Sequence, residues 1–373
     1  MHILYVFPEP LPLPRARGLQ VAHFVRALAL EGAKVTLAYV PGEGEHPFVS
    51  IGYDVPENVA LLPLSRNLPL TRIKSQRFFM WRLADWLNQE RKSGKGPSVV
   101  FFRHVKAAVH FAQQFSDIPF VYEAHEVFAH TAKSSQQERM FLLEAEVLYK
   151  ASLIVAISNG AADGLKRNFK LQKPIIILPS AVEVPDSLPE KPWAESKLHL
   201  IYAGSLFGWK GVDDLVDALN ILPGFNLTII GGNIDQIERL KKRRSSSGGE
   251  VSFIGHLSYC EVQSALAGSC VAVLPNRADS VSAFTSPLKL FEYMAAGCAI
   301  VASDLPVLHE VLGNDGAAWA QPNDPASLAN AIRQVCEQSD GGASLGSLSR
   351  ERVRPYTWRS RGNTLIRHIA ALN

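Results

Sequence analysis

The stretch Ser-Pro-Leu-Lys-Leu-Phe-Glu-Tyr-Met-Ala-Ala-Gly, residues 286–297, predicts a helix that begins abruptly and packs into a core. Ser286 is a natural N-cap and Pro287 fits the first helical position, so we expect the helix to begin between them. A short apolar run at 299–302 follows at once and is typical of a buried strand. A helix followed directly by a buried strand is the repeating unit of α/β folds.

The same alternation of apolar runs and helical patterns extends along the whole chain. The runs that we interpret as strands are 3–7, 35–40, 99–102, 120–122, 154–157 and 175–178, then 198–203, 226–230, 251–254, 271–274 and 299–302. Helical patterns lie between them, for example at 211–221, and one more forms the tail at 356–371. Such alternation predicts mostly parallel sheets that are covered on both faces.

A proline-rich, charged segment at 179–192 interrupts this alternation and is typical of a linker. We therefore expect an α/β fold of two Rossmann-like, doubly wound domains that face each other across a cleft. The first domain is expected at 1–183 with a returning helix at about 356–373, and the second at 184–355. Open sheets of this kind bind ligands beyond the carboxyl ends of their strands.

The composition excludes several classes of protein. The chain has 373 residues, 47% hydrophobic and 20% charged, and its formal net charge of +3 is too small to imply nucleic acid. Its four cysteines form no Cys-x-x-Cys pair, so we interpret them as small buried apolar residues in a reducing compartment. No apolar run approaches the roughly 18 residues that span a bilayer. We expect a cytoplasmic protein, or one bound peripherally to the inner face of the membrane.

Two segments of the second half carry groups suited to a phosphorylated ligand. The loop at 203–211 holds three glycines between a strand and a helix, which lets backbone approach a ligand closely. Lys210 lies at the helix entrance, where it would neutralise a diphosphate leaving group; the alternative is a solvated lysine in a turn. Glu292 lies about one and a half turns into its helix and would accept hydrogen bonds from a ribose diol. The alternative for Glu292 is a surface position on a capped helix.

One histidine of the first half lies where a strand is expected to end. His125 follows the apolar run 120–122 within the segment Tyr-Glu-Ala-His-Glu, residues 122–126. It is therefore expected at the carboxyl end of a strand, facing the cleft, where an imidazole can donate to a sugar hydroxyl or to phosphate. A purely structural role is the alternative.

In this order and spacing, these segments resemble the retaining glycosyltransferases of family 4, which have two Rossmann-like domains (the GT-B fold). The resemblance covers nearly the whole chain, and the segments that carry it are Gly18 with the helix after it, 123–126, 157–158, 203–211, 253–255, 286–297 and Trp358 in a closing helix. The donor-binding residues that it implies are Gly18, Gly204, Ser205, Lys210, Gly255, Thr285, Ser286, Pro287, Leu288 and Glu292. His125 and Lys210 would be the catalytic residues.

The resemblance also implies a reaction. A sugar would be transferred with retention from a UDP- or GDP-sugar, by front-face attack in which the leaving phosphate helps to deprotonate the acceptor. The acceptor would be a lipid-linked or polysaccharide precursor. No Asp-x-Asp motif lies in a suitable loop, so we expect no metal and no other cofactor. A non-catalytic homologue that binds nucleotide sugar, and a nucleotide-sugar epimerase, are the alternatives.

Two positions depart from the family pattern. Phe284 stands where members often carry a glutamate, and Ser205 where many carry an arginine. The usual carboxylate contact to the donor sugar is therefore either missing or supplied by another residue, for which Asp279, Ser282 and Thr285 are the candidates.

A basic run with interleaved aromatic residues at 66–92 lies in the half that the resemblance assigns to the acceptor. A helix of this composition can lie on an anionic membrane, so an anionic membrane or a lipid-linked acceptor is the expected partner. The alternative is that its aromatic residues, Phe78, Phe79, Trp81 and Trp86, pack into the core. The residues that we assign to the acceptor or membrane side are Arg15, Arg17, Arg72, Lys74 and Arg77.

Overall fold

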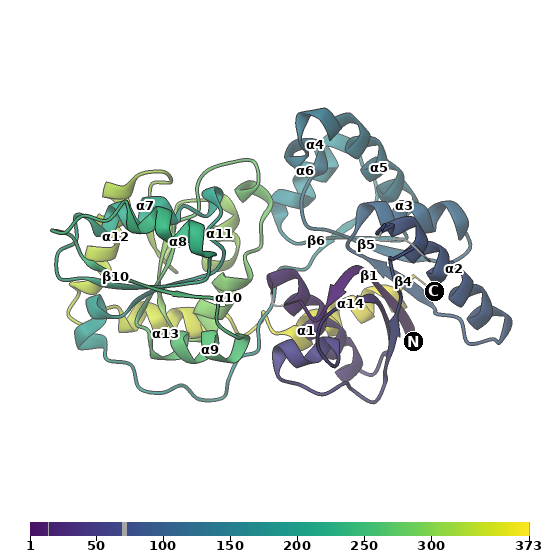
Figure 1. Ribbon diagram of the computed structural model, residues 1–373, viewed down its shortest axis with the longest axis horizontal. Coiled ribbons are helices and arrows are strands. Elements are labelled where there is room, and N and C mark those ends of the chain that lie inside the picture. The colour runs from purple at the N-terminus through teal and green to yellow at the C-terminus, as the bar shows by residue number, and fades with distance from the viewer. Residues whose placement is uncertain (14, 69–72, 373) are drawn as a thin grey trace. The chain divides into compact units, whose positions relative to one another are not determined.

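The computed structural model describes residues 1–13, 15–68 and 73–372 (Figure 1). The chain forms two compact units, each with its own sheet and core. Unit 1 consists of Met1–Pro179 and Trp358–Asn373, and unit 2 of Ser180–Thr357.

The described residues of unit 1 form a parallel seven-stranded sheet in the order β3-β2-β1-β4-β5-β6-β7. The strands are β1 (His2–Leu11), β2 (Lys34–Pro41), β3 (Val59–Pro63), β4 (Val99–Phe102), β5 (Phe120–Ala124), β6 (Leu153–Ala156) and β7 (Ile175–Ile177). The central strands are apolar on both faces, and all the residues of β4, Val-Val-Phe-Phe, are buried. Such strands form the middle of a sheet that has helices on both sides.

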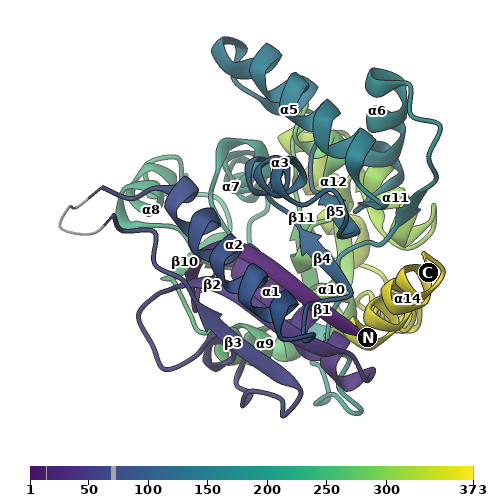
Figure 2. The ribbon, with the colours of Figure 1, turned by 90° about the vertical axis from the view of Figure 1, so that its right-hand side faces the viewer.

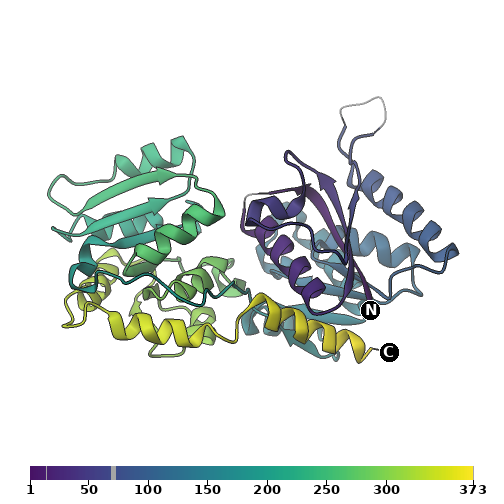
Figure 3. The ribbon, with the colours of Figure 1, turned by 90° about the horizontal axis from the view of Figure 1, so that it is seen from below.

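Helices cover both faces of this sheet (Figure 1). They are α1 (Ala16–Leu30), α2 (Gln76–Lys92), α3 (Val105–Gln114), α4 (Phe128–Thr131), α5 (Gln137–Lys150), α6 (Asn159–Phe169) and α14 (Trp358–Ala370), with 3-10 turns η1 (Pro47–Ile51) and η2 (Ser134–Gln136). On one face α1 packs against α14, and on the other α3 packs against α2 and α5. Figure 3 shows the yellow α14 beside the purple α1, so the end of the chain completes the unit in which the chain begins.

Unit 2 repeats this topology. Its described residues form a parallel six-stranded sheet in the order β10-β9-β8-β11-β12-β13, the order of the first six strands of unit 1. The strands are β8 (Leu200–Ala203), β9 (Asn226–Ile230), β10 (Glu250–Gly255), β11 (Val271–Leu274), β12 (Ala299–Ser303) and β13 (Ala318–Ala320). Both sheets therefore have the doubly wound strand order of nucleotide-binding folds.

The two faces of the second sheet carry separate apolar clusters. The helices are α7 (Val212–Leu219), α8 (Ile234–Lys241), α9 (Tyr259–Gly268), α10 (Leu288–Ala295), α11 (Pro306–Leu312), α12 (Pro325–Cys336) and α13 (Ala343–Arg352), with 3-10 turns η3 (Trp193–Leu198), η4 (Gly208–Lys210) and η5 (Ser282–Phe284). Alternate residues of β11 belong to different clusters: Val271 and Val273 pack with α7 and α12, whereas Ala272 and Leu274 pack with α9 and α10. This alternation buries the strand on both sides.

The expected fold class, two Rossmann-like α/β halves, is confirmed. The apolar runs did not indicate β3 and β13, both of which are edge strands. The expectation for the cysteines is correct for Cys270 and Cys298, which are buried, but wrong for Cys260, which is exposed. Cys260 lies in the first turn of α9, a helix that buries little of its surface.

Candidate functional site

The carboxyl ends of β8 and β11 mark the candidate site of unit 2. These neighbouring strands lie in the middle of the sheet, and the chain continues from β8 to β9 on one side and from β11 to β12 on the other. Doubly wound sheets bind ligands at such a switch point. Two loops leave the sheet there, residues 204–211 after β8 and residues 275–287 after β11.

Close backbone packing fixes the shape of the first loop. The amide of Gly204 donates to the carbonyl oxygen of Ile230 at 2.9 Å. Gly211 has a φ of +68°, and a Cβ atom there would lie 1.7 Å from the carbonyl oxygen of Pro275. Only glycine therefore lets this loop pass against the segment that follows β11. The amide of Arg277 donates to the carbonyl oxygen of Trp209 at 2.9 Å and joins the two loops.

Lys210 ends η4 at the entrance to α7. Its ammonium lies 3.6 Å from the centre of the Trp209 ring, and within the described residues it forms no ion pair. Burial lowers the pKa of Lys210 to about 7, and the charge of nearby Asp279 offsets part of this shift. An anionic ligand would stabilise the charged form of such a lysine and would therefore bind favourably to it.

The start of α10 differs from the expectation. The helix begins at Leu288, Pro287 occupies the N-cap position, and no side chain caps the helix among the described residues. The prediction that Ser286 is the cap was wrong, because its hydroxyl accepts a hydrogen bond from the amide of Ser180 at 2.8 Å. The Ser180 hydroxyl in turn donates to the carbonyl oxygen of Ser286 at 2.6 Å. The first turn of α10 thus retains amide groups that suit an anion.

Glu292 lies on α10 beyond this first turn and is 8% exposed, so it is not a surface residue. Burial raises the pKa of its carboxyl to about 7, and the charge of Lys289 offsets part of this shift. The neighbouring Phe291 and Met294 are fully buried. Within the described residues the carboxylate makes no hydrogen bond or ion pair, which is costly for a buried acid unless a ligand supplies the partner.

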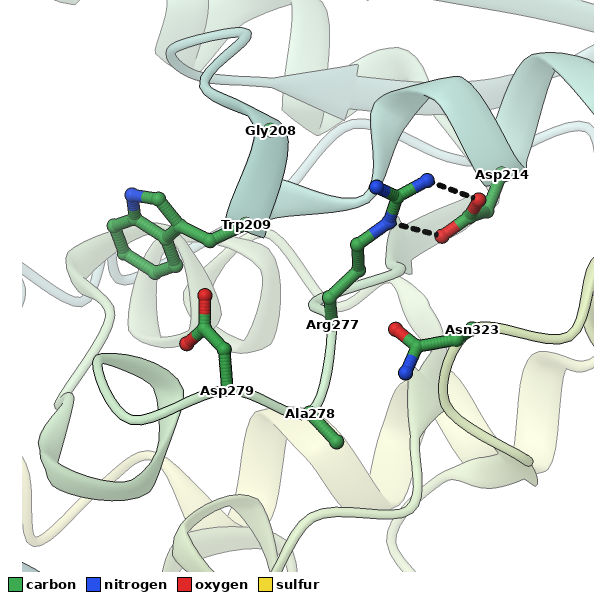
Figure 4. A pocket seen from close by; sticks show the side chains of 7 residues that line it. All are labelled: Gly208, Trp209, Asp214, Arg277, Ala278, Asp279 and Asn323. Atoms are coloured by element: carbon green, nitrogen blue, oxygen red, sulfur yellow. Dashed lines mark hydrogen bonds and ion pairs between the residues drawn. The ribbon is translucent and has the colours of Figure 1, made fainter.

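Of the three candidates for the missing carboxylate at Phe284, Asp279 lies closest to an open site. Figure 4 shows Asp279 near Trp209 in an open pocket of about 410 Å³. Arg277 on the same pocket wall is held by a two-fold hydrogen bond to Asp214, at 2.7 and 2.6 Å. One oxygen of Asp279 accepts from the amide of Ser282 at 2.7 Å, which leaves the other oxygen for a ligand.

The remaining predicted donor-side residues have structural contacts. The Thr285 hydroxyl donates to the carbonyl oxygen of Ser282 at 3.3 Å, and Leu288 is buried. Ser205 accepts a hydrogen bond at its carbonyl oxygen from the Tyr202 hydroxyl at 2.7 Å. Gly255 has a φ of +77° at the end of β10.

A group of paired charges lies at the carboxyl ends of β4 and β5 in unit 1. Glu123 is 2% exposed, and its carboxylate contacts Arg361 from α14 and His125. Burial alone would raise the pKa of Glu123, but Arg361, His125 and Arg103 outweigh it and hold that pKa well below its usual range. The pairs make Glu123 a buried anion with its partners in place.

Both ring nitrogens of His125 are engaged in this group. Arg103 donates to Nδ1 at 3.1 Å, and because arginine only donates, Nδ1 must be the acceptor. The proton therefore lies on Nε2, which donates to Glu123. Burial, followed by the charge of Arg103, lowers the pKa of His125 to about 4, so the ring is neutral at pH 7. A donor role for His125 toward a ligand requires one of these contacts to open.

The predicted acceptor side contains both buried and exposed residues. Gly18, which is predicted to bind the donor, also belongs to unit 1: it lies in the first turn of α1, where a Cβ atom would be 2.3 Å from the carbonyl oxygen of Leu13. Arg17 pairs with Glu9 at 2.8 Å, and Arg15 is exposed.

On α2 (Figure 2), Phe79 is fully buried, whereas Trp81 is 62% exposed. Phe78 and Trp86 are partly buried. Lys74 and Arg77 are exposed, and Arg72 lies outside the described residues.

Sequence reasoning missed Arg103, Arg361 and Lys289. Arg361 contacts Glu123 across 238 positions of the chain, and no local pattern indicates such a pair. Lys289 gives one signal, since it is a single charge among the apolar neighbours Leu288 and Leu290 in a helix that is otherwise buried.

In the described part of the chain, no helix is long and apolar enough to cross a membrane. The same residues contain no group of three or more histidine, cysteine, aspartate or glutamate side chains that could hold a metal ion.

Two family models match the chain and together cover most of it. Residues 18–184 match the family described as Glycosyltransferase Family 4, and residues 197–338 match the one described as Glycosyl transferases group 1. This chain belongs to the family 4 glycosyltransferases. The boundary between the two matches falls close to the junction of units 1 and 2.

Relatives of this chain include two mannosyltransferases. The O-antigen chain mannosyltransferase RfbU of Salmonella typhimurium is 22% identical over 54% of this chain and 55% of its own length. A phosphatidyl-myo-inositol mannosyltransferase of Mycolicibacterium smegmatis is 30% identical over 40% of this chain and 38% of its own length. The matched part thus spans about half or less of these relatives.

Solved structures resemble this chain over its full length. Sucrose-phosphate synthase of Thermosynechococcus elongatus has a TM-score of 0.78 at 18% identity, with 100% of both chains covered. Anabaena HepE in complex with UDP-glucose has a TM-score of 0.76 at 16% identity, again over 100% of both chains. At these identities the likeness establishes the fold, which is that of the GT-B glycosyltransferases.

Proposed function

We propose that this chain transfers a sugar from a nucleotide diphosphate sugar to an acceptor, and that unit 2 binds the donor. The observation that carries the proposal is the pair Lys210 and Glu292. Lys210 is half-buried and Glu292 is buried, neither has an ionic partner in the described structure, and both belong to segments that follow the switch-point strands. A nucleoside diphosphate offers phosphate oxygens to a lysine and a ribose diol to a carboxylate.

The reaction that we infer is retaining and independent of metal. Lys210 would balance the charge that develops on the departing diphosphate, together with the amides at the start of α10. Asp279 would contact the donor sugar in place of the carboxylate missing at Phe284, since its free oxygen borders the pocket. His125 would be a catalytic residue, held in one tautomer by Glu123 and Arg103, and Gly18 would contribute to donor binding.

The test begins with binding and continues to turnover. A thermal-shift screen against UDP, GDP, ADP and CDP is expected to give stabilisation by UDP or GDP. The corresponding glucose, galactose and mannose donors are then incubated with the protein, and proton NMR follows the anomeric signal of the product. Transfer or slow donor hydrolysis with the donor's anomeric configuration supports the proposal, and activity is expected to persist in EDTA. Binding without any turnover would indicate a non-catalytic homologue, and conversion of the donor sugar without acceptor would indicate an epimerase.

We further propose that unit 1 docks on an anionic membrane or an anionic lipid-linked acceptor through the start of α2. Ile73 and Trp81 are each 62% exposed, and Lys74 and Arg77 lie beside them in the sequence. Exposed aromatic and basic residues together suit an anionic lipid surface, to which each basic residue contributes about 1 kcal/mol. By their names, one relative acts on an O-antigen chain and the other on phosphatidyl-myo-inositol, which agrees with such an acceptor.

Vesicle co-sedimentation tests this docking. Wild type is expected to bind anionic vesicles at low salt, to bind less at high salt, and to ignore neutral vesicles. Lys74→Glu/Arg77→Glu should abolish the binding, whereas the matched variant Lys241→Glu/Lys242→Glu in unit 2 should retain it. Equal, negligible binding of all three proteins would instead favour a soluble acceptor.

A further inference from the structure

Lys289 is a buried lysine whose ammonium has no hydrogen-bond partner among the described residues. It is the second residue of α10, and only 8% of its surface is exposed. Removing an ammonium group from water without supplying acceptors is strongly unfavourable. A residue that weakens the fold in this way is expected to serve a ligand.

The surroundings of Lys289 place its side chain at the glycine loop after β8. Its ammonium lies 3.9 Å from the centre of the Tyr202 ring. That ring is held in place, because the Tyr202 hydroxyl donates to the carbonyl oxygen of Ser205 at 2.7 Å. A Cβ atom at Gly204 would be 3.5 Å from Cδ of Lys289, so the lysine passes directly beside the loop.

The nearby charges do not balance Lys289. Glu292 is one turn further along α10, but the two side chains form no ion pair within 4 Å. Burial lowers the pKa of Lys289 well below its usual range, and the positive charge of Lys210 lowers it further. Two lysines therefore converge on the glycine loop and the uncapped start of α10, with one exposed carboxylate, Asp279, near Lys210. An anion with at least two negative charges would satisfy both ammonium groups and the helix amides together.

We propose that Lys289 donates hydrogen bonds to the diphosphate of the bound nucleotide sugar and is, with Lys210, one of two cations that hold it. This assignment rests on the proposed function of unit 2 as the donor-binding unit. Lys289 also places a positive group beside the glycine loop, where Ser205 itself supplies no charge. The ring of Tyr202 keeps the lysine stem in position while no ligand is bound.

Unit 2 contains a matched control for this assignment. Lys191 is equally buried, at 9% exposure, but its ammonium donates to the carbonyl oxygens of Leu266, at 3.2 Å, and of Ser269. It also contacts Sγ of Cys298 at 3.5 Å. Lys191 thus has the partners that Lys289 lacks, and its removal would leave buried carbonyl groups unpaired.

Replacing each lysine by methionine is expected to give opposite results. Lys289→Met should lower the affinity for UDP or GDP, whichever wild type binds, by about tenfold or more, while the thermal midpoint of the free protein stays equal or rises. Lys191→Met should lower the thermal midpoint and leave the affinity within about twofold. Calorimetric titration gives the affinities, and thermal unfolding followed by circular dichroism gives the midpoints.

Two results would overturn the assignment. Unchanged affinity in Lys289→Met would remove Lys289 from the diphosphate site, and a lowered midpoint would make it a structural residue like Lys191. Lys289→Gln repeats both measurements if the methionine variant does not fold. Failure of wild type itself to bind any nucleoside diphosphate would contradict the proposed function instead, so the two failures are distinguishable.

Discussion

In unit 1 the buried carboxylate of Glu123 at the carboxyl edge of the sheet is paired, whereas in unit 2 the buried Lys289 and Glu292 are not. Glu123 contacts Arg361 and His125 in a closed group of side chains. Lys289 and Glu292 in unit 2 are also buried, each with 8% of its surface exposed, yet they form no ion pair with each other. The two sheets share one strand order, so the topology does not cause the difference.

The difference contrasts a structural use of buried charge in unit 1 with the binding role that we propose for the buried charges of unit 2. A buried ion pair with its hydrogen bonds in place holds a particular arrangement, here the tautomer of His125 and the position of α14. Buried groups without partners instead move toward their neutral forms, as the lowered pKa of Lys210 and the raised pKa of Glu292 indicate. A ligand of opposite charge can stabilise such groups, whereas the paired groups already have their partners.

Breaking the paired group of unit 1 should have the largest effect on stability. Arg361→Met is expected to lower the free energy of unfolding by about 3–5 kcal/mol, because it leaves Glu123 buried without its main partner. Arg359 on the same helix pairs with Glu31 but is 72% exposed, so Arg359→Met should leave the free energy of unfolding nearly unchanged. Urea unfolding followed by circular dichroism measures both. A similar, small effect in the two variants would mean that the buried pair does not stabilise unit 1.

Removing Lys210 from unit 2 should instead affect turnover. Lys210→Ala is expected to lower kcat by about 100–1000-fold, since its interaction with the leaving diphosphate strengthens as charge develops. The fold should be retained, because Lys210 has no ionic partner to lose among the described residues. Steady-state kinetics with the donor found in the screen provides the measurement, with the exposed Lys241→Ala as the control. Turnover within about twofold of wild type would place the stabilising charge elsewhere.

The sequence predicts the two sheets well because each central strand is a short, strongly apolar run. Residues 99–102 and 271–274 are buried on both faces, and their runs mark them within one residue. The edge strands β3 and β13 are less apparent, since β3 ends in Pro63 and β13 has only three residues. An edge strand needs less apolar surface than a central one, so its pattern is weaker.

The site is predicted less completely, because its contacts join distant parts of the chain. Ser286 has the residue type and position of an N-cap, but its hydroxyl binds the amide of Ser180, which lies 106 positions earlier. Glu292 is predicted as a ligand-binding residue from its place in the helix, and that role stays a prediction. The pairing of Glu123 with Arg361 depends on the return of α14 to unit 1, and no local pattern gives the pairing.

Glu292→Ala tests whether the unpaired carboxylate serves a ligand. The variant should bind the nucleoside diphosphate more weakly by roughly 1.5–3 kcal/mol, the scale of hydrogen bonds to a charged group. Its stability should not fall, because a buried acid without a partner is removed. Calorimetry measures the affinity, and Glu238→Ala on the surface of α8 is the control. Unchanged affinity in a well-folded variant would exclude Glu292 from the site.

The smallest expected effect is a pH dependence of donor binding, which would show whether the unpaired groups of unit 2 change their charges when the ligand binds. The pKa of Lys210 is lowered to about 7 in the free protein, so at pH 8 most of this lysine is neutral. A bound diphosphate raises that pKa, because it favours the charged ammonium. Binding at pH 8 should therefore take up protons, and the affinity should fall as the pH rises from 7 to 9.

The groups near Lys210 allow the residue that takes up this proton to be identified. Asp279 raises the pKa of Lys210, while the Lys289 ammonium lies close enough to interact with it. Glu292, with a pKa raised to about 7, is mostly ionised at pH 8 and contributes little there. Titration calorimetry at pH 8 in two buffers of different ionisation enthalpy gives the number of protons taken up. Lys210→Met should lower that number, and an uptake of zero in wild type would mean that both lysines are already charged before the ligand arrives.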